Sequence, residues 1–276
     1  DHSCPKLPVD YQLGENNVSS TASVTVVLDP EETQALLQDV PGVYHTQIND
    51  VLLTALAEAL RKWTSATSLS VDLEGHGREE ILEDLDLSRT VGWFTTITPV
   101  VLHVAPSFQP GTALTSIKEQ LRQVPNRGIG YGVLRYLGTD GPRAKLETAA
   151  EPQISFNYLG QIDAVAPRFG FFGAANDFSG SLYSPRGNRR HLLDVIGNVV
   201  ERRLRMSFTY SVNFHRAETI QQLAEDFRAA LRAIIAHCQS AEAGGFTASD
   251  FLAARMSQDD FNNLLAKINK SADSQN

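Results

Sequence analysis

The stretch YHTQINDVLLTALAEALRKWTSATSLSVDLE at residues 44–74 decides the fold of this chain. Apolar side chains recur every four positions through its first twenty residues, beginning at Ile48 and Leu52. This spacing predicts an amphipathic helix over residues 44–63. Residues 68–73 instead alternate apolar and polar side chains, which predicts a strand with one apolar and one polar face.

The same two patterns extend over most of the chain. Alternation and β-branched content predict further strands at residues 22–28, 97–104, 154–159, 192–200 and 204–213. Helical periodicity and capping signals predict helices that begin near Asp29-Pro30 and that cover residues 114–124 and 219–237. Strands alternating with long amphipathic helices predict an α/β fold, with a mixed β-sheet covered by amphipathic helices.

The two ends of the chain lack this patterning. Residues 1–20 are rich in Pro, Asp, Asn and Ser, and we expect an extended lead-in segment. The periodic elements fill residues 21–243 and end before a Gly-Gly pair. Residues 244–276 are polar, with one short helical pattern from Phe261 to Ile268. We expect a linker or docking tail there that can be removed without loss of the core.

Composition limits the partners and the compartment. The 276 residues carry a net charge of −8 and no block of five or six Lys or Arg, which argues against a nucleic-acid groove. The longest apolar runs are far short of the ~20 residues of a membrane helix, so we expect no membrane partner. We expect Cys4 and Cys238 to be free thiols in the cytoplasm, with Cys238 buried on a helix. No Cys/His cluster has the spacing of a metal site.

The segment EGHGRE at residues 74–79 holds the densest group of reactive side chains. It follows the predicted strand, and its two glycines allow the backbone to approach a ligand closely. Four ionisable side chains surround these glycines. A solvated charged turn would give the same pattern, so both interpretations are open from the residues alone.

Five motifs together resemble the epimerization domains of nonribosomal peptide synthetases. In chain order they are TQINDVLL at 46–53, EGHGRE at 74–79, RTVGWFT at 89–95, GIGYG at 128–132 and FNYLG at 156–160. Their order and spacing are similar to the family's, and a looser likeness continues to residue 238. The resemblance implies a chloramphenicol-acetyltransferase-like fold of two similar halves with a tunnel between them. This chain would be the C-terminal half-domain.

The resemblance also implies an activity. Such a domain is an isomerase of antibiotic biosynthesis, which inverts the Cα of an aminoacyl or peptidyl thioester from L to D. No intrinsic cofactor is implied, because the phosphopantetheine arm of a peptidyl carrier protein presents the substrate. Neighbouring synthetase domains are further implied partners. A condensation (amide-forming) unit of the same fold, which does not usually carry EGHGRE, and a noncatalytic carrier-docking half-domain are the alternatives.

Inversion at Cα needs a base, an acid and donors for the charge that develops on the thioester oxygen. Glu74, at the strand end, is our candidate for proton transfer. Arg78 is always protonated and can orient Glu74 or bind a charged intermediate. By resemblance Asn157 and Tyr158 also face the tunnel. Asn157 would orient the thioester oxygen or donate to it, and Tyr158 would relay a proton or donate a hydrogen bond, unless Tyr158 is a core aromatic.

The family's other half carries a His-His-x-x-x-Asp motif, whose second His faces the Glu across the tunnel. The seven histidines of this chain include no adjacent pair. We therefore expect a partner N-terminal half that carries this motif, and negligible epimerization by these 276 residues alone.

Three other features have weaker interpretations. Three arginines and His191 at residues 186–191 form a basic cluster that can meet the phosphate of a phosphopantetheine arm, although a solvated loop is the simpler interpretation. We expect Asp50 to be a structural hydrogen-bond acceptor in its helix. Trp93 is expected to anchor the core or to form part of the tunnel wall.

Overall fold

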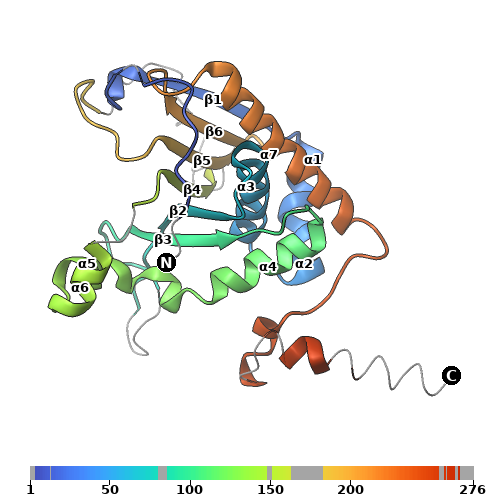
Figure 1. Cartoon of the computed structure of the whole chain (residues 1–276). Helices are drawn as coiled ribbons and strands as arrows, with labels where there is room; N and C mark the ends of the chain where they lie inside the picture. The colour runs from blue at the N-terminus through green and yellow to red at the C-terminus, as the bar shows by residue number, and fades with distance from the viewer. Residues whose placement is uncertain are drawn as a thin grey trace.

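The computed structural model describes residues 4–12, 14–79, 86–147, 151–162, 183–254, 258, 260–264 and 267. Within these residues six strands form one sheet, in the order β1-β6-β5-β4-β2-β3 (Figure 1). The strands are β1 Thr21–Val27, β2 Ser68–Gly75, β3 Thr96–His103, β4 Ile154–Gln161, β5 Leu193–Val200 and β6 Arg203–Ser211. β4 is parallel to both β2 and β5, and the other neighbours are antiparallel. The predicted mixed sheet is therefore confirmed.

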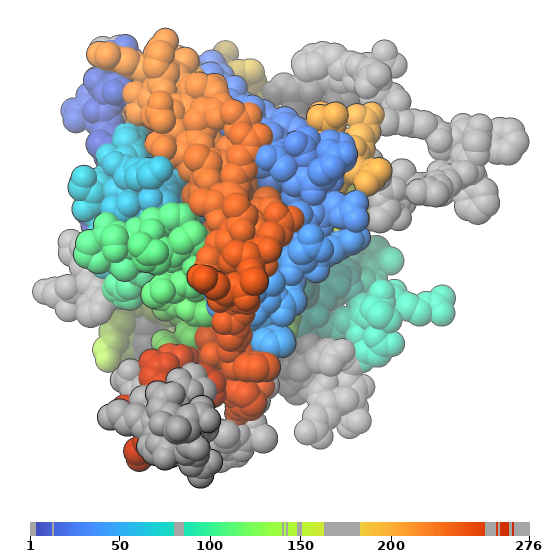
Figure 2. Space-filling view, turned by 90° about the vertical axis from the view of Figure 1, so that its right-hand side faces the viewer, coloured from blue at the N-terminus to red at the C-terminus, as the bar shows by residue number. Residues whose placement is uncertain are grey.

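The helices form a layer against this sheet. They are α1 Pro30–Gln34, a π-helical turn Ala35–Asp39, α2 Val40–Tyr44, α3 Ile48–Thr64, α4 Pro110–Arg122, α5 Gly130–Leu137, α6 Asp140–Glu147 and α7 Ala217–Cys238. Figure 2 shows α7, in orange, running between α4 in green and the blue segment that contains α1 and α2. α3 packs against α7, and both lie over the sheet (Figure 1). No helix in the described ranges is long and apolar enough to cross a membrane.

The hydrophobic core lies between the helices and one face of the sheet, which we call the covered face. Every residue of α3 from Asp50 to Leu60 is buried, because sheet and helices surround this helix. On β6 the side chains of Leu204, Met206 and Phe208 are at most 1% exposed. The period-two pattern predicted this alternation, and Leu69 and Val71 of β2 follow it.

The opposite face of the sheet, which we call the open face, is mostly polar, and Ile97, Val101 and Ile196 are exposed on it. One cross-strand row joins five neighbouring strands through the register partners Ser23, Thr209, Asp194, Ser155 and Asp72. Apart from Asp72 and Ser211, the side chains that point to this face from the six strands are half-buried or exposed. The sheet is thus covered by the helices on one face, and the polar side chains gather on the other.

Several element ends differ from the sequence prediction for local reasons. α3 begins at Ile48 and not at residue 44, because His45 adopts a left-handed conformation with φ 53°. Gln47 and Asp50 then form a capping box at the new helix start. α4 begins at Pro110, four residues before the predicted start, with proline in its first turn. Helices α5 and α6 were not predicted.

The start of the chain is extended, as expected, and it lies along the sheet. The backbone N–H of Leu7 donates to Oε1 of Gln153 at 2.7 Å, and Asn16 Nδ2 donates to the carbonyl of His191 at 2.8 Å. Cys4 and Cys238 are both free, and Cys238 is buried at the end of α7, as predicted.

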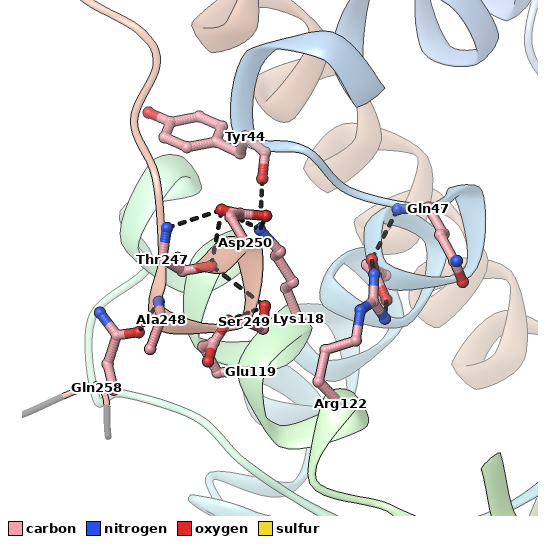
Figure 3. A network of polar contacts seen from close by, with 11 residues as sticks. Tyr44, Gln47, Lys118, Glu119, Arg122, Thr247, Ala248, Ser249, Asp250 and Gln258 are labelled. Carbon is pink, nitrogen blue, oxygen red and sulfur yellow. Dashed lines mark hydrogen bonds and ion pairs between the residues drawn. The ribbon is translucent and has the colours of Figure 1, made fainter. Parts of the chain in front are cut away.

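Part of the expected linker or docking tail at residues 244–276 packs on the core, and its removal without loss of the core stays a prediction. Lys118 of α4 is 1% exposed, and its Nζ donates to both carboxylate oxygens of Asp250, at 2.6 and 2.8 Å, and to the carbonyl of Tyr44 (Figure 3). Thr247 donates to the same carboxylate from its backbone N–H. The tail therefore neutralises a buried cation of the core. Residues 265, 266 and 268–276 lie outside the described residues.

Candidate active site

Glu74 is the last residue but one of β2. Alternation along the strand places its side chain on the open face with Asp72, whereas Leu73 packs against the core. The Glu74 side chain is half-buried and makes no hydrogen bond or ion pair with any described residue. Its carboxylate is thus available to accept a proton from a ligand.

Asn157 lies beside Glu74 because β2 and β4 are parallel. Asp72 pairs with Ser155 and Leu73 with Phe156, and the next residues on the two strands are Glu74 and Asn157. Neighbouring strands lie about 4.8 Å apart, so these two side chains share one edge and one face of the sheet. The structure therefore brings together two of the four site residues that the sequence suggested.

Tyr158 is not on that face. It follows Asn157 in a regular strand and has the orientation of Phe156, which is 2% exposed in the core. Its ring packs against the core and, together with the side chain of Met206, lies next to Gly197. Burial raises the pKa of the Tyr158 hydroxyl. Neighbouring strand residues point to opposite faces, so Asn157 and Tyr158 do not share a face of the sheet, and the expectation that Tyr158 faces the tunnel stays a prediction.

Arg78 holds a loop in place. Its Nη1 donates to the carbonyl of Leu87 at 2.7 Å and its Nη2 to that of Thr90 at 2.9 Å. The guanidinium lies over the ring of Phe94, 4.3 Å from its centre. Among the described residues Arg78 has no contact with Glu74, so the expectation that it orients this carboxylate is corrected. Its fork of donors instead fastens the RTVGWFT motif to EGHGRE.

The loop that Arg78 binds also explains why the second glycine of EGHGRE, Gly77, has no side chain. Gly77 has φ +65°, and a Cβ there would overlap the carbonyl oxygen of Phe94. Glu79 binds Arg127 at 3.2 Å, the residue that directly precedes the GIGYG motif. Three of the five motifs therefore meet at the end of β2, close to Glu74.

Trp93 does not anchor the core of this chain. Its side chain is 90% exposed, and the neighbouring Val91 is fully exposed. A place in a tunnel wall stays a prediction. Asp50 has the structural role we expected, since it accepts from the backbone N–H of Gln47 and binds both terminal nitrogens of Arg122 (Figure 3).

Sequence reasoning missed a charged network next to Glu74. His191 is 8% exposed, and its Nε2 lies 2.8 Å from Oδ2 of Asp72, which is itself 1% exposed. Its Nδ1 lies 3.4 Å from Oδ1 of Asp194. The sequence held a weak indication of this network, namely the polar face of β2 and the spacing of three between His191 and Asp194.

The network sets the charge of its members. Burial alone lowers the pKa of His191, but the hydrogen bonds with Asp194 and Asp72 outweigh it and raise this pKa to about 9. Burial opposes ionisation of Asp194 too, yet His191, Ser155 and Arg189 hold its pKa at about 2. His191 is therefore a cation between two carboxylates at neutral pH.

Most residues of the predicted basic cluster bind carboxylates of this network. Arg189 is 7% exposed and donates to Asp194 at 2.6 Å. Arg190 lies 3.5 Å from Asp72 and 3.6 Å from Glu151. Of the cluster, Arg186 and Arg190 are exposed. Across the part of the chain that the structure describes, no group of three His, Cys, Asp or Glu side chains is placed to hold a metal ion.

The chain is similar in sequence to parts of larger synthases. The chain is 45% identical over 269 residues to the chondramide synthase cmdD of Chondromyces crocatus, a match that covers 98% of this chain and 7% of that protein. It is 39% identical to gramicidin S synthase 1 of Brevibacillus brevis, over 89% of this chain and 23% of the relative. The chain thus spans a small part of the curated relatives that it matches.

Among solved structures, the epimerization domain from the third module of tyrocidine synthetase B matches with a TM-score of 0.78 and 36% identity, over 86% of this chain and 52% of that one. The condensation domain of the Monacolin K polyketide synthase MokA matches with a TM-score of 0.59 at 17% identity, which shows the fold alone. The fold is the chloramphenicol-acetyltransferase-like α/β fold that the motifs implied. The condensation domain model matches residues 1–256, and the chain therefore belongs to the condensation-domain family of nonribosomal peptide synthetases.

Proposed function

We propose that this chain is the C-terminal subdomain of an epimerization domain, and that it inverts the Cα of a carrier-bound aminoacyl or peptidyl thioester from L to D. The observation that carries the proposal is the unpartnered, half-buried carboxylate of Glu74 beside Asn157 on the open face. The match to the tyrocidine synthetase epimerization domain supports it.

Glu74 and Asn157 have different roles in the proposed chemistry. The Cα–H of a thioester is weakly acidic, so its removal needs a positioned base, and the Glu74 carboxylate fills that role. As the proton leaves, negative charge develops on the thioester oxygen. The amide N–H of Asn157 can donate to this oxygen, which lowers the barrier. Proton return from the opposite side of Cα then produces the D configuration.

The proposal needs two partners. A peptidyl carrier protein would present the thioester on its phosphopantetheine arm, within reach of the open face. A second half-domain with a His-His-x-x-x-Asp motif would cover this face and supply the group on the other side of Cα. Neighbouring synthetase domains would deliver and accept the carrier.

Replacement of Glu74 tests the proposal directly. In a domain that carries both halves, Glu74→Gln keeps the size of the side chain and removes the titratable carboxylate. We expect the rate of inversion to fall about 10²–10⁴-fold, the usual contribution of a general acid or base. The measurement is exchange of the Cα proton with deuterated solvent, together with the L-to-D ratio on a loaded carrier.

A matched control is Glu31→Gln, which changes an exposed carboxylate on α1 and should leave both readings unchanged. Near-normal exchange in Glu74→Gln would contradict the role of Glu74. Amide formation with a second loaded carrier, without Cα exchange in the unmodified domain, would favour the condensation activity instead.

A further inference from the structure

The strands that carry Glu74 and Asn157, β2 and β4, have the shortest pairing in the sheet. β2 pairs with β3 along its whole length, from Ser68 to Gly75. Against β4, by contrast, β2 pairs through Asp72 and Leu73 alone. The distance between the two proposed site residues therefore depends on a short parallel seam, and parallel pairing is slightly less stable per residue than antiparallel pairing.

His191 bridges this seam from the far side. It lies two residues before β5, on the other side of β4, and its Nε2 reaches Asp72 of β2 at 2.8 Å. Its Nδ1 faces Asp194 of β5, and Ser155 of β4 donates to the same carboxylate at 2.6 Å. One imidazole thus links the three central strands in the row next to Glu74. That row lies two residues, about 6.6 Å, along β2 from Glu74.

The link needs the charged form of the ring. A carboxylate accepts hydrogen bonds, and a neutral imidazole has one N–H to donate, whereas the imidazolium has two. Both ring nitrogens of His191 face carboxylates, so both must carry a proton if both contacts are to hold. The remaining charged groups around the pair are Arg189 against Asp194 and Arg190 against Asp72.

Arg190 also lies near Glu151, whose side chain is 52% exposed and which binds Arg135 at 2.7 Å. The lead-in residue Asn16 donates to the carbonyls of Arg189 and His191, which holds the loop that carries the ring.

We propose that His191 is a positioning residue for Glu74 and Asn157, because its imidazolium fastens β2 to β5 across the seam with β4. This inference rests on the proposed function for its catalytic consequence, although the fastening itself does not. A reactant misplaced by about 1 Å can cost about 10²-fold in rate, so a loosened seam should lower turnover more than substrate affinity.

The proposal has a defined pH dependence. The pKa of His191 in the fold is about 9, above its ordinary value of 6.5. The stabilisation it contributes is therefore complete below pH 6.5 and is lost as the pH rises through about 9. Turnover should decline over the same alkaline range, as one carboxylate contact is lost.

The experiment uses His191→Gln and Asp72→Asn in a domain that carries both halves. His191→Gln offers one amide donor and no charge. We expect amide hydrogen exchange along β2 and β4 to accelerate at least tenfold, kcat for inversion to fall about 10- to 100-fold, and KM to stay within twofold. The fall in kcat above pH 9 should disappear in the variants.

Lys62→Gln is the control. It breaks an exposed ion pair with Asp226 in the helical layer, at 3.3 Å, and should change none of these readings. Unchanged exchange along β2 and β4 in His191→Gln would overturn the proposal. If the unmodified domain inverts no substrate, the proposed function fails, but the exchange measurement still decides whether His191 fastens the seam.

A measurement on the unmodified domain covers the case in which the variants do not fold. Nitrogen-detected NMR should show both ring nitrogens of His191 protonated at pH 7.5. A neutral ring at that pH would overturn the proposal.

Discussion

Ser207 and Phe208 are neighbours on β6, yet they belong to two different surfaces of the same sheet. Phe208 is fully buried on the covered face, where its ring meets that of Phe227 edge to face at 5.5 Å. Ser207 is half-buried on the open face and shares a hydrogen bond with Thr25. The covered face carries the stability of the fold, and the open face carries the groups that chemistry can use.

Two histidines repeat this contrast. His191 belongs to the open face, and carboxylates keep it charged. His215 is 1% exposed, packs edge to face on Trp63, and has no hydrogen-bond partner for either ring nitrogen among the described residues. The same side chain is therefore held as a cation in one place and as a neutral ring in the other. The surroundings, and not the residue type, decide the charge.

The largest effect should come from the covered face. Phe208→Ala removes a buried ring, and we expect the free energy of unfolding to fall by about 3–5 kcal/mol. Ser207→Ala, one residue away, should change it by less than about 0.5 kcal/mol, as is usual for surface positions. Denaturant unfolding of both variants measures this difference. Equal losses for the two variants would contradict the division between the faces.

The tail offers the next largest effect, because the helical layer contains one buried ammonium group among the residues that the structure describes. Asp250→Ala leaves Lys118 in the core without its carboxylate, and we expect a loss of about 3 kcal/mol. Asp226→Ala breaks the exposed pair with Lys62 and should cost less than about 1 kcal/mol. Thermal and denaturant unfolding provide the measurement. An Asp250→Ala variant as stable as Asp226→Ala would show that the tail contributes little.

The smallest expected effect is a loss of stability at acidic pH. Burial lowers the pKa of His215 below 6.5; the charge of Asp10 raises this pKa, and the charge of Arg189 lowers it further. The neutral ring therefore stabilises the fold above pH 6.5, and stability is lost as the pH falls below that value, by at most about 1.4 kcal/mol per pH unit. His215→Phe should lack this component. The check is the difference in unfolding free energy between pH 7.5 and 5.5, which should be larger in the unmodified chain than in the variant.

Periodicity predicted the covered face well, because burial on one side imposes a repeat that the sequence displays. The stripes of α3 and α7 and the alternation of β6 lie where the pattern placed them. α5 was missed because it carries no buried residue. Its apolar side chains Val133, Leu134, Tyr136 and Leu137 are all substantially exposed.

The site could be predicted in part. The motif resemblance pointed to Glu74 and Asn157, and the parallel pairing of β2 with β4 then placed them together. The role of Arg78 depends on partners 9 and 12 positions away, and the contact of His191 with Asp72 spans 119 positions; no local pattern contains that information. The contact between the tail and α4 could not be predicted for the same reason, because Lys118 and Asp250 are separated by 132 positions.

The place of β1 in the sheet has a consequence for how this protein is made. Thr21 pairs with Ser211, so the first strand finds its neighbour after roughly 190 further residues have left the ribosome. At about 5–20 residues per second, that delay is about 10–40 s. For this interval the strand has free backbone donors and acceptors, which other nascent chains can capture. The strand that most needs shielding during translation is therefore β1, the first of the six described strands to be made.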